Sequence, residues 1–175
     1  YLSLGGAIMG KIDGTPNATL LFDLAETPSD IGRAGADLML GLKLRAYKFD
    51  LYKTKKKDDD KGSTKSADKM HVAIALADPV GAKRDAKRAD ALANGITLAR
   101  NLVNEPPNVL YPASFAQRAK DLQKLGVEVQ VLDEKALHKL GFRMLLGVGQ
   151  GSDHESKVVI MRWNGAKSAK AKPLA

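Results

Sequence analysis

The pair Pro106-Pro107 most constrains this chain, because it stops a long helical pattern and fixes the direction in which the chain continues. Proline has no backbone N–H, its ring clashes with the preceding helical turn, and the residue before it favours extended conformations. The helical spacing that begins near Gly81 must therefore end near Asn104. Asn104 and Asn108 can hydrogen-bond the local backbone, as residues in turns do. We predict a junction between two parts of the chain here.

Three apolar runs before this junction are strand candidates. Residues 2–12 are interpreted as strand-like, with Gly5 and Gly6 marking a bulge or a site of close approach. Residues 18–24 and 71–76 are short apolar runs, typical of buried strands.

Two helices are predicted among these strands. The first is capped by Ser29 or Asp30 and ends between Tyr47 and Tyr52. Its apolar face comprises residues at helical spacing, namely Ile31, Ala34, Leu38, Leu42 and Ala46. The second helix runs from about residue 82 to 104. Its apolar stripe comprises Ala86, Ala89, Ala93, Ile96 and Leu102.

After the junction, residues 111–114 open a helix that Gly126 ends, since glycine is common just past a helix. Its predicted apolar face is Phe115, Ala119, Leu122 and Leu125. Alternating Val127, Val129 and Val131 predict a half-buried strand.

Next, Asp133 is predicted to cap a short helix that runs through Leu140 and is closed by Gly141. Residues 145–152 are interpreted as a glycine-rich turn, and residues 157–163 as a further strand. Because helices and strands alternate along the whole chain, the predicted fold class is α/β.

Composition excludes several classes of protein. The chain has 44% hydrophobic residues, a normal supply for a folded core, and no run long enough to cross a membrane, so no membrane partner is expected. The absence of cysteine excludes disulfides, thiolate zinc sites and a cysteine nucleophile, and fits a reducing compartment such as the cytoplasm. A net charge of +8 would attract nucleic acid or other anions, but a part of a longer protein need not share its parent's charge.

Histidines and acidic residues give no convincing metal site. His71, His138 and His154 are far apart, and none is in a metal-binding spacing. Glu134 and His138 are four residues apart, as an ordinary solvated helix pair would be. The run Asp153-His154-Glu155 is an improbable site, because adjacent side chains rarely converge on one ion.

The glycine-rich run resembles a phosphate loop only superficially. A phosphate loop needs a helix N-terminus after its glycines, whereas a turn and a strand are expected after Gly151. Ser152 also lacks the G-x-S-x-G pattern of a serine nucleophile.

The strongest basic cluster is Lys53, Lys55, Lys56 and Lys57, with Tyr47, Phe49 and Tyr52 just upstream. Aromatic residues beside a basic cluster can support nucleic-acid binding. However, Asp58-Asp59-Asp60 follows at once, so a solvated loop over residues 53–66 is the favoured interpretation.

Several strings, in order, resemble the leucyl aminopeptidase (cytosol aminopeptidase) family. NLVNEPPNVLYPASFA (residues 101–116) is similar to the entry to that family's catalytic domain. The similarity continues through residues 126–142, 145–165 and 172–175, and upstream through LRAYKFDLYKTKKK at residues 44–57. Several strings in the right order are together more specific than any one of them.

The resemblance implies a domain organisation. Residues 1–81 would be the C-terminal part of an N-terminal α/β domain, residues 82–105 a linking helix, and residues 106–175 the beginning of a peptidase catalytic domain. It also implies a cytoplasmic homo-hexamer that removes N-terminal, leucine-type residues from peptide substrates. Two divalent metal ions, manganese or zinc, would polarise the scissile carbonyl and activate a bridging water.

Residues 173–175 resemble the start of a strand of that family. In the family, the metal ligands and the catalytic lysine and arginine come after this strand. None has a counterpart in this sequence, so we assign no catalytic and no metal-binding residue. We expect the chain to be an excerpt that is inactive alone and poorly soluble, since open strand edges favour aggregation.

Two other functions stay open. One is a non-enzymatic module that binds nucleic acid through Lys53–Lys57, which the resemblance allows because some family members bind DNA. The other is a degenerate relative kept only for assembly.

Overall fold

The structure is a computed structural model that describes residues 1–24, 26, 28–54, 70–166, 168 and 172. The chain forms two compact units, Tyr1–Asn104 and Glu105–Ala175.

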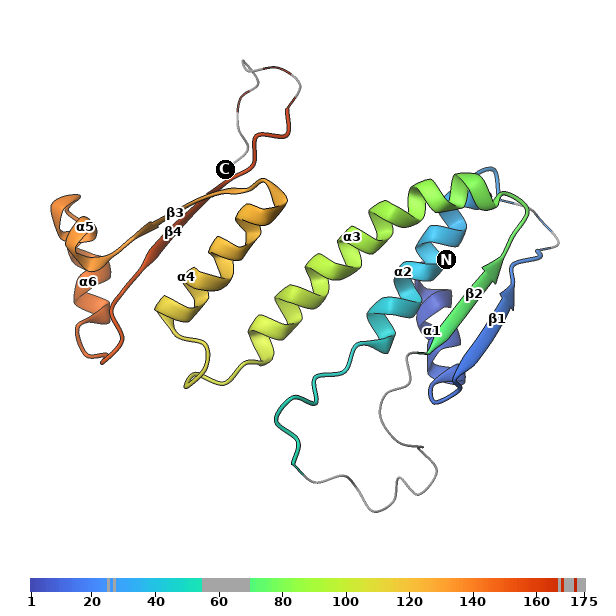
Figure 1. Ribbon diagram of the computed structural model, residues 1–175, viewed down its shortest axis with the longest axis horizontal. Coiled ribbons are helices and arrows are strands. Elements are labelled where there is room, and N and C mark those ends of the chain that lie inside the picture. Colours follow the sequence, from blue (N-terminus) through green and yellow to red (C-terminus); the bar gives the residue numbers. More distant parts are fainter. Residues whose placement is uncertain (25, 27, 55–69, 167, 169–171, 173–175) are drawn as a thin grey trace. The chain divides into compact units, whose positions relative to one another are not determined.

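The first unit is a strand pair covered by helices (Figure 1). Strands β1 (Asn17–Leu21) and β2 (His71–Ala75) pair in parallel, with Asn17 opposite His71 and Leu21 opposite Ala75. Its helices are α1 (Leu2–Ile12), α2 (Ile31–Ala46) and α3 (Pro79–Asn104). The predicted α/β class is confirmed.

The first prediction, a strand over residues 2–12, is wrong, because these residues form α1. A short apolar run does not distinguish a strand from a buried helix, and here Gly5 and Met9, four residues apart, are the buried positions. The predicted close approach at Gly5 is confirmed. A Cβ atom on Gly5 would overlap the Leu38 carbonyl oxygen of α2, and one on Gly41 would overlap the Leu2 carbonyl oxygen of α1.

Helix α2 is the centre of the unit. Of the two predicted N-caps, Asp30 is the one observed, and its Oδ1 accepts a hydrogen bond from the backbone N–H of Arg33 at 2.9 Å. Leu38 and Ala34 pack with Phe22, Leu20 and Ile74 from the strand side. On the other side of α2, Ala36 and Leu40 pack against Ala89 and Ala93 of α3. The predicted end of α3 at Asn104 is confirmed.

The strands over residues 18–24 and 71–76 are present, but they are not buried on both faces. Ala18, Leu20, Val72 and Ile74 face the helices, whereas the alternate residues, including Leu21 and Ala73, are exposed. Parallel sheets are normally covered on both faces, and that expectation explains the error.

The second unit pairs strands β3 (Glu128–Leu132) and β4 (Val158–Arg162) in antiparallel fashion, with Glu128 opposite Arg162. Its helices are α4 (Pro112–Asp121), the 3-10 helix η1 (Leu122–Leu125), α5 (Glu134–Lys139) and α6 (Arg143–Gly149).

Several local predictions for this unit are confirmed. Gly126 has φ +88° after η1, and Gly141 has φ +80° after α5, so each occupies the left-handed region that favours glycine. Asp133 caps α5 by accepting a hydrogen bond from the Ala136 N–H at 2.8 Å.

Two other predictions for this unit are partly wrong. The predicted apolar face of the first helix is confirmed at Ala119, which is buried, but Phe115 and Leu125 are exposed, and Ala116 is the other buried residue of α4. Of residues 145–152, predicted to form a glycine-rich turn, residues 145–149 are instead helical as part of α6, and only residues 150–152 form a turn and bend. Leu146 is buried and anchors α6, which outweighs the low helix propensity of glycine.

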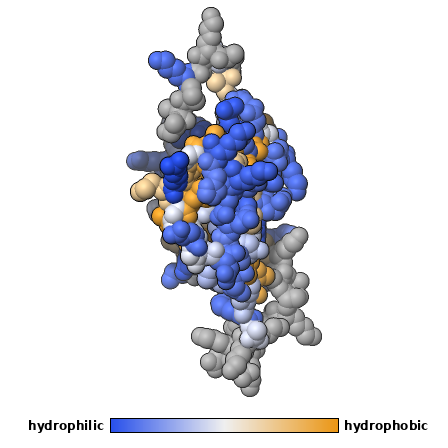
Figure 2. Space-filling model, turned by 90° about the vertical axis from the view of Figure 1, so that its left-hand side faces the viewer, coloured by the Kyte–Doolittle hydropathy of each residue, from blue (hydrophilic) through white to orange (hydrophobic). Residues whose placement is uncertain are grey.

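Apolar side chains remain exposed among polar ones on the side of the second unit that carries α5 and α6 (Figure 2). They include Leu140, Met144 and Val148. In the part of the chain that the structure describes, no helix is both long and apolar enough to cross a membrane.

Candidate functional site

A polar cluster joins the end of α2 to the end of α3, just before the Pro-Pro junction. The Tyr47 hydroxyl donates a hydrogen bond to Oδ1 of Asn101 at 2.8 Å and accepts one from Nδ2 of Asn104 at 3.0 Å. The Arg100 guanidinium lies 5.5 Å from the centre of the Tyr47 ring and donates to the Leu44 carbonyl oxygen at 2.7 Å. These contacts satisfy a carbonyl in the last turn of α2 and hold the last turn of α3 in place.

We predict that Tyr47→Phe loosens the last turn of α3 by about 1 kcal/mol, because both hydrogen bonds of the hydroxyl are lost. Native-state hydrogen exchange of the α3 amides measures this loss as faster exchange near Asn101. Tyr111→Phe is the matched control, since it removes the hydroxyl of a tyrosine outside this polar cluster. Equal protection of Asn101 in both variants would refute a role for the Tyr47 hydroxyl.

The junction itself is a tight turn. The Pro106 carbonyl oxygen accepts from the N–H groups of both Val109 and Leu110, each at 2.9 Å. The carboxylate of Glu105 is almost fully buried and lies 3.4 Å from the Arg118 guanidinium of α4. This segment therefore fixes how the chain enters α4, and it holds no evident nucleophile or base.

The predicted basic cluster is described only at its first residue. Lys53 is exposed and pairs with Asp50 three residues earlier. Lys55, Lys56 and Lys57 lie outside the described residues, as does most of the loop predicted over residues 53–66. Nucleic-acid binding there stays a prediction.

The three histidines do not gather into one site among the described residues. The His154 ring stacks on Tyr111, with centroids 4.1 Å apart and planes 10° apart. Oε1 of Glu134 accepts a hydrogen bond from the Ser156 N–H at 2.9 Å, and the solvated helix pair of Glu134 with His138 stays a prediction. Among the described residues, no three His, Cys, Asp or Glu side chains gather where they could hold a metal ion. The described side chains therefore do not form a metal centre.

Ser152 and the glycines near it have structural partners. The Ser152 N–H donates to the Gly149 carbonyl oxygen at 3.0 Å, and its hydroxyl oxygen accepts from the His154 N–H at 3.1 Å. A Cβ atom on Gly149 would overlap the Ser156 hydroxyl, so this glycine permits close packing between the end of α6 and the start of β4. The arrangement is that of a packed connection.

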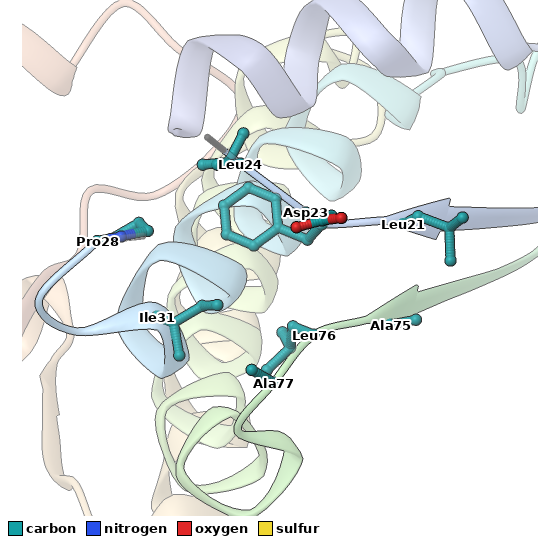
Figure 3. A pocket seen from close by; sticks show the side chains of 9 residues that line it. Leu21, Asp23, Leu24, Pro28, Ile31, Ala75, Leu76 and Ala77 are labelled. Atoms are coloured by element: carbon teal, nitrogen blue, oxygen red, sulfur yellow. The ribbon is translucent and has the colours of Figure 1, made fainter. Parts of the chain in front are cut away.

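A hollow of about 370 Å³ lies where β1 and β2 end and α2 begins (Figure 3). Its walls are Leu21, Phe22, Asp23, Leu24, Pro28, Ile31, Ala75, Leu76 and Ala77. Asp23 is the one charged residue among them. Sequence patterns did not single out this site, although Asp23 was visible as the one acidic residue within the apolar run of residues 18–24.

The chain is similar to one class of peptidases, the aminopeptidases. Residues 97–175 match the model described as "Cytosol aminopeptidase family, catalytic domain". The chain is 51% identical, over 99% of its length, to the "Probable cytosol aminopeptidase" of Rhodopseudomonas palustris strain TIE-1, and 49% identical over its whole length to that of Brucella anthropi. The chain is therefore similar to one part of these cytosol aminopeptidases, and it spans about a third of their length, 34% in each case.

Solved structures show the same fold. The chain is similar to "Bottromycin maturation enzyme BotP in complex with Mn", with a TM-score of 0.73, 23% identity, and coverage of 91% of this chain and 32% of that one. A mutant of tomato leucine aminopeptidase gives a TM-score of 0.65 at 22% identity, covering 81% of this chain and 28% of the other. The two-unit architecture described here is thus found within larger enzymes.

Proposed function

We propose that this chain is the structural portion of a metal-dependent aminopeptidase, which removes N-terminal amino acids of the leucine type from peptides. The observation that supports it is the near-complete match of the chain to probable cytosol aminopeptidases at about 50% identity. The chain would supply part of an N-terminal α/β domain, the helix α3 and the first elements of the catalytic domain. The residues that perform the chemistry would lie outside it.

The metal requirement is part of the proposal. We expect two divalent ions, manganese or zinc, to polarise the scissile carbonyl and to lower the pKa of a bound water. The similar structure of BotP is described as a complex with Mn. No group of metal-binding side chains is found among the described residues of this chain, so no step of the reaction is assigned to any of them.

The test is removal and return of the metal. We predict that the natural protein, purified and dialysed against a chelator, loses nearly all release of leucine from leucyl p-nitroanilide. Manganese or zinc should restore it, and magnesium serves as the comparison ion. A protein that keeps full activity after chelation would contradict metal dependence, and one that never releases leucine would contradict the aminopeptidase proposal.

The oligomeric state and the cellular location of the natural protein are also part of the proposal. We expect the natural protein to be a cytoplasmic homo-hexamer, as the family resemblance implies. Sedimentation of the natural protein measures this, and a monomer at micromolar concentration would count against it.

A further inference from the structure

The hollow at the ends of β1 and β2 has the size and position of a small-ligand site. Its volume of about 370 Å³ falls inside the range of roughly 300–1,000 Å³ that is common for such sites. In open α/β sheets, ligands bind outside the carboxyl ends of parallel strands, and β1 and β2 are such a pair. Leu21 and Ala75, the last residues of these strands, both line the hollow (Figure 3).

The lining determines which ligand would fit. Eight of the nine residues are apolar, and among them Phe22 is buried. Leu21 is 80% exposed and Leu24 is also exposed, so a bound apolar group would remove existing apolar surface from water. Among the described residues of the walls, Asp23 carries the only charge, and none is a lysine or an arginine. The site is therefore complementary to an apolar group next to a positive charge.

We propose that this hollow binds a small apolar primary amine, with its hydrocarbon part against Ile31 and Leu76 and its ammonium group near the Asp23 carboxylate. Apolar contact supplies most of the affinity. Because Asp23 is exposed, its attraction to the ammonium is modest, worth about a threefold preference over a neutral ligand. A ligand that carries a carboxylate is repelled by Asp23.

This proposal goes beyond the proposed function, since it places a ligand on the first unit. Peptides and amino-acid amides with an apolar first residue have this chemistry. The choice of these molecules as natural ligands rests on the proposed function, whereas the binding of the amine does not.

The experiment is methyl NMR of the natural protein, labelled at isoleucine and titrated with isopentylamine. The reporter is the δ1 methyl group of Ile31, assigned with Ile31→Val. Isopentyl alcohol and isovalerate are the matched neutral and negative ligands of similar shape. We expect a saturable shift of the Ile31 signal, with a dissociation constant on the order of 1 mM for a ligand of this size. The alcohol should bind about threefold more weakly, and isovalerate should not bind measurably.

Two variants test the assignment. Asp23→Asn should make the amine and the alcohol bind equally, whereas the control Asp153→Asn, an exposed aspartate of the second unit, should change nothing. Ala77→Leu should fill the hollow and abolish the shift. An unmoved Ile31 signal, or equal shifts with amine, alcohol and isovalerate, would overturn the proposal. The readout needs no hydrolysis, so it succeeds or fails independently of the aminopeptidase assay.

Discussion

Replacing Leu137 with alanine is expected to destabilise the second unit by about 3 kcal/mol, the largest single effect we predict. Leu137 lies on α5 and its side chain is 0% exposed. Truncation removes buried methyl groups and leaves a cavity, and close-packed surroundings collapse only partly into such a cavity. Hydrogen exchange of the β3 and α5 amides in the natural protein should accelerate by roughly 100-fold, since 1.4 kcal/mol corresponds to a factor of ten.

Leu140→Ala is the matched control, one turn further along. That leucine is 59% exposed, so its truncation should change stability by less than about 0.5 kcal/mol. If both variants behave alike, α5 does not pack as described here.

Gly41→Ala is expected to destabilise the first unit by about 2 kcal/mol, although alanine is the better helix former. The added methyl group would overlap the Leu2 carbonyl oxygen and lie 3.0 Å from the Gly6 nitrogen. Both are backbone atoms of α1, so relief requires α1 and α2 to separate. Faster hydrogen exchange of the α1 amides measures this loss of stability.

Gly95→Ala makes the same substitution at a helical glycine whose surroundings leave room for a methyl group. Gly95 lies within α3, and among the described residues no heavy atom beyond the neighbouring turns of its own helix backbone lies within 4 Å of its would-be Cβ. This substitution should stabilise α3 by roughly 0.5–1 kcal/mol, the difference in helix propensity between glycine and alanine. The two variants should therefore have opposite signs, and stabilisation by both would contradict the close approach of α1 and α2.

The elements predicted correctly are those with local signals. Asp30 and Asp133 cap helices through hydrogen bonds within three residues, and Gly126 and Gly141 take up left-handed conformations that few other residues tolerate. Such signals act over a few residues, so a single sequence is enough to detect them.

The elements predicted wrongly depend on contacts between distant residues. Residues 2–12 are helical because Gly5 and Met9 bury against α2, and α6 is helical although it contains Gly147 and Gly149. Phe115 has helical spacing with the buried Ala119, yet Phe115 is exposed and Ala116 is the second residue of α4 that packs inside. Spacing alone did not reveal which side of a helix finds a partner.

The candidate sites also depend on contacts between residues that are distant in the sequence. The Tyr47 hydroxyl bonds residues of α3 that are 54 and 57 positions away, and the hollow beside Asp23 forms only where two strands and a helix meet. Neither could be found without the fold. Family resemblance, in contrast, was readable from ordered strings along residues 101–165.

The intact mass of the natural protein tests most directly whether this chain is the structural portion of a longer aminopeptidase. The chain accounts for 18.8 kDa and spans 34% of its relatives. Our account predicts a mass about three times larger, with residues for the chemistry in the remainder. A mass near 18.8 kDa would contradict it, because the natural protein would then contain none of the residues that the proposed reaction requires.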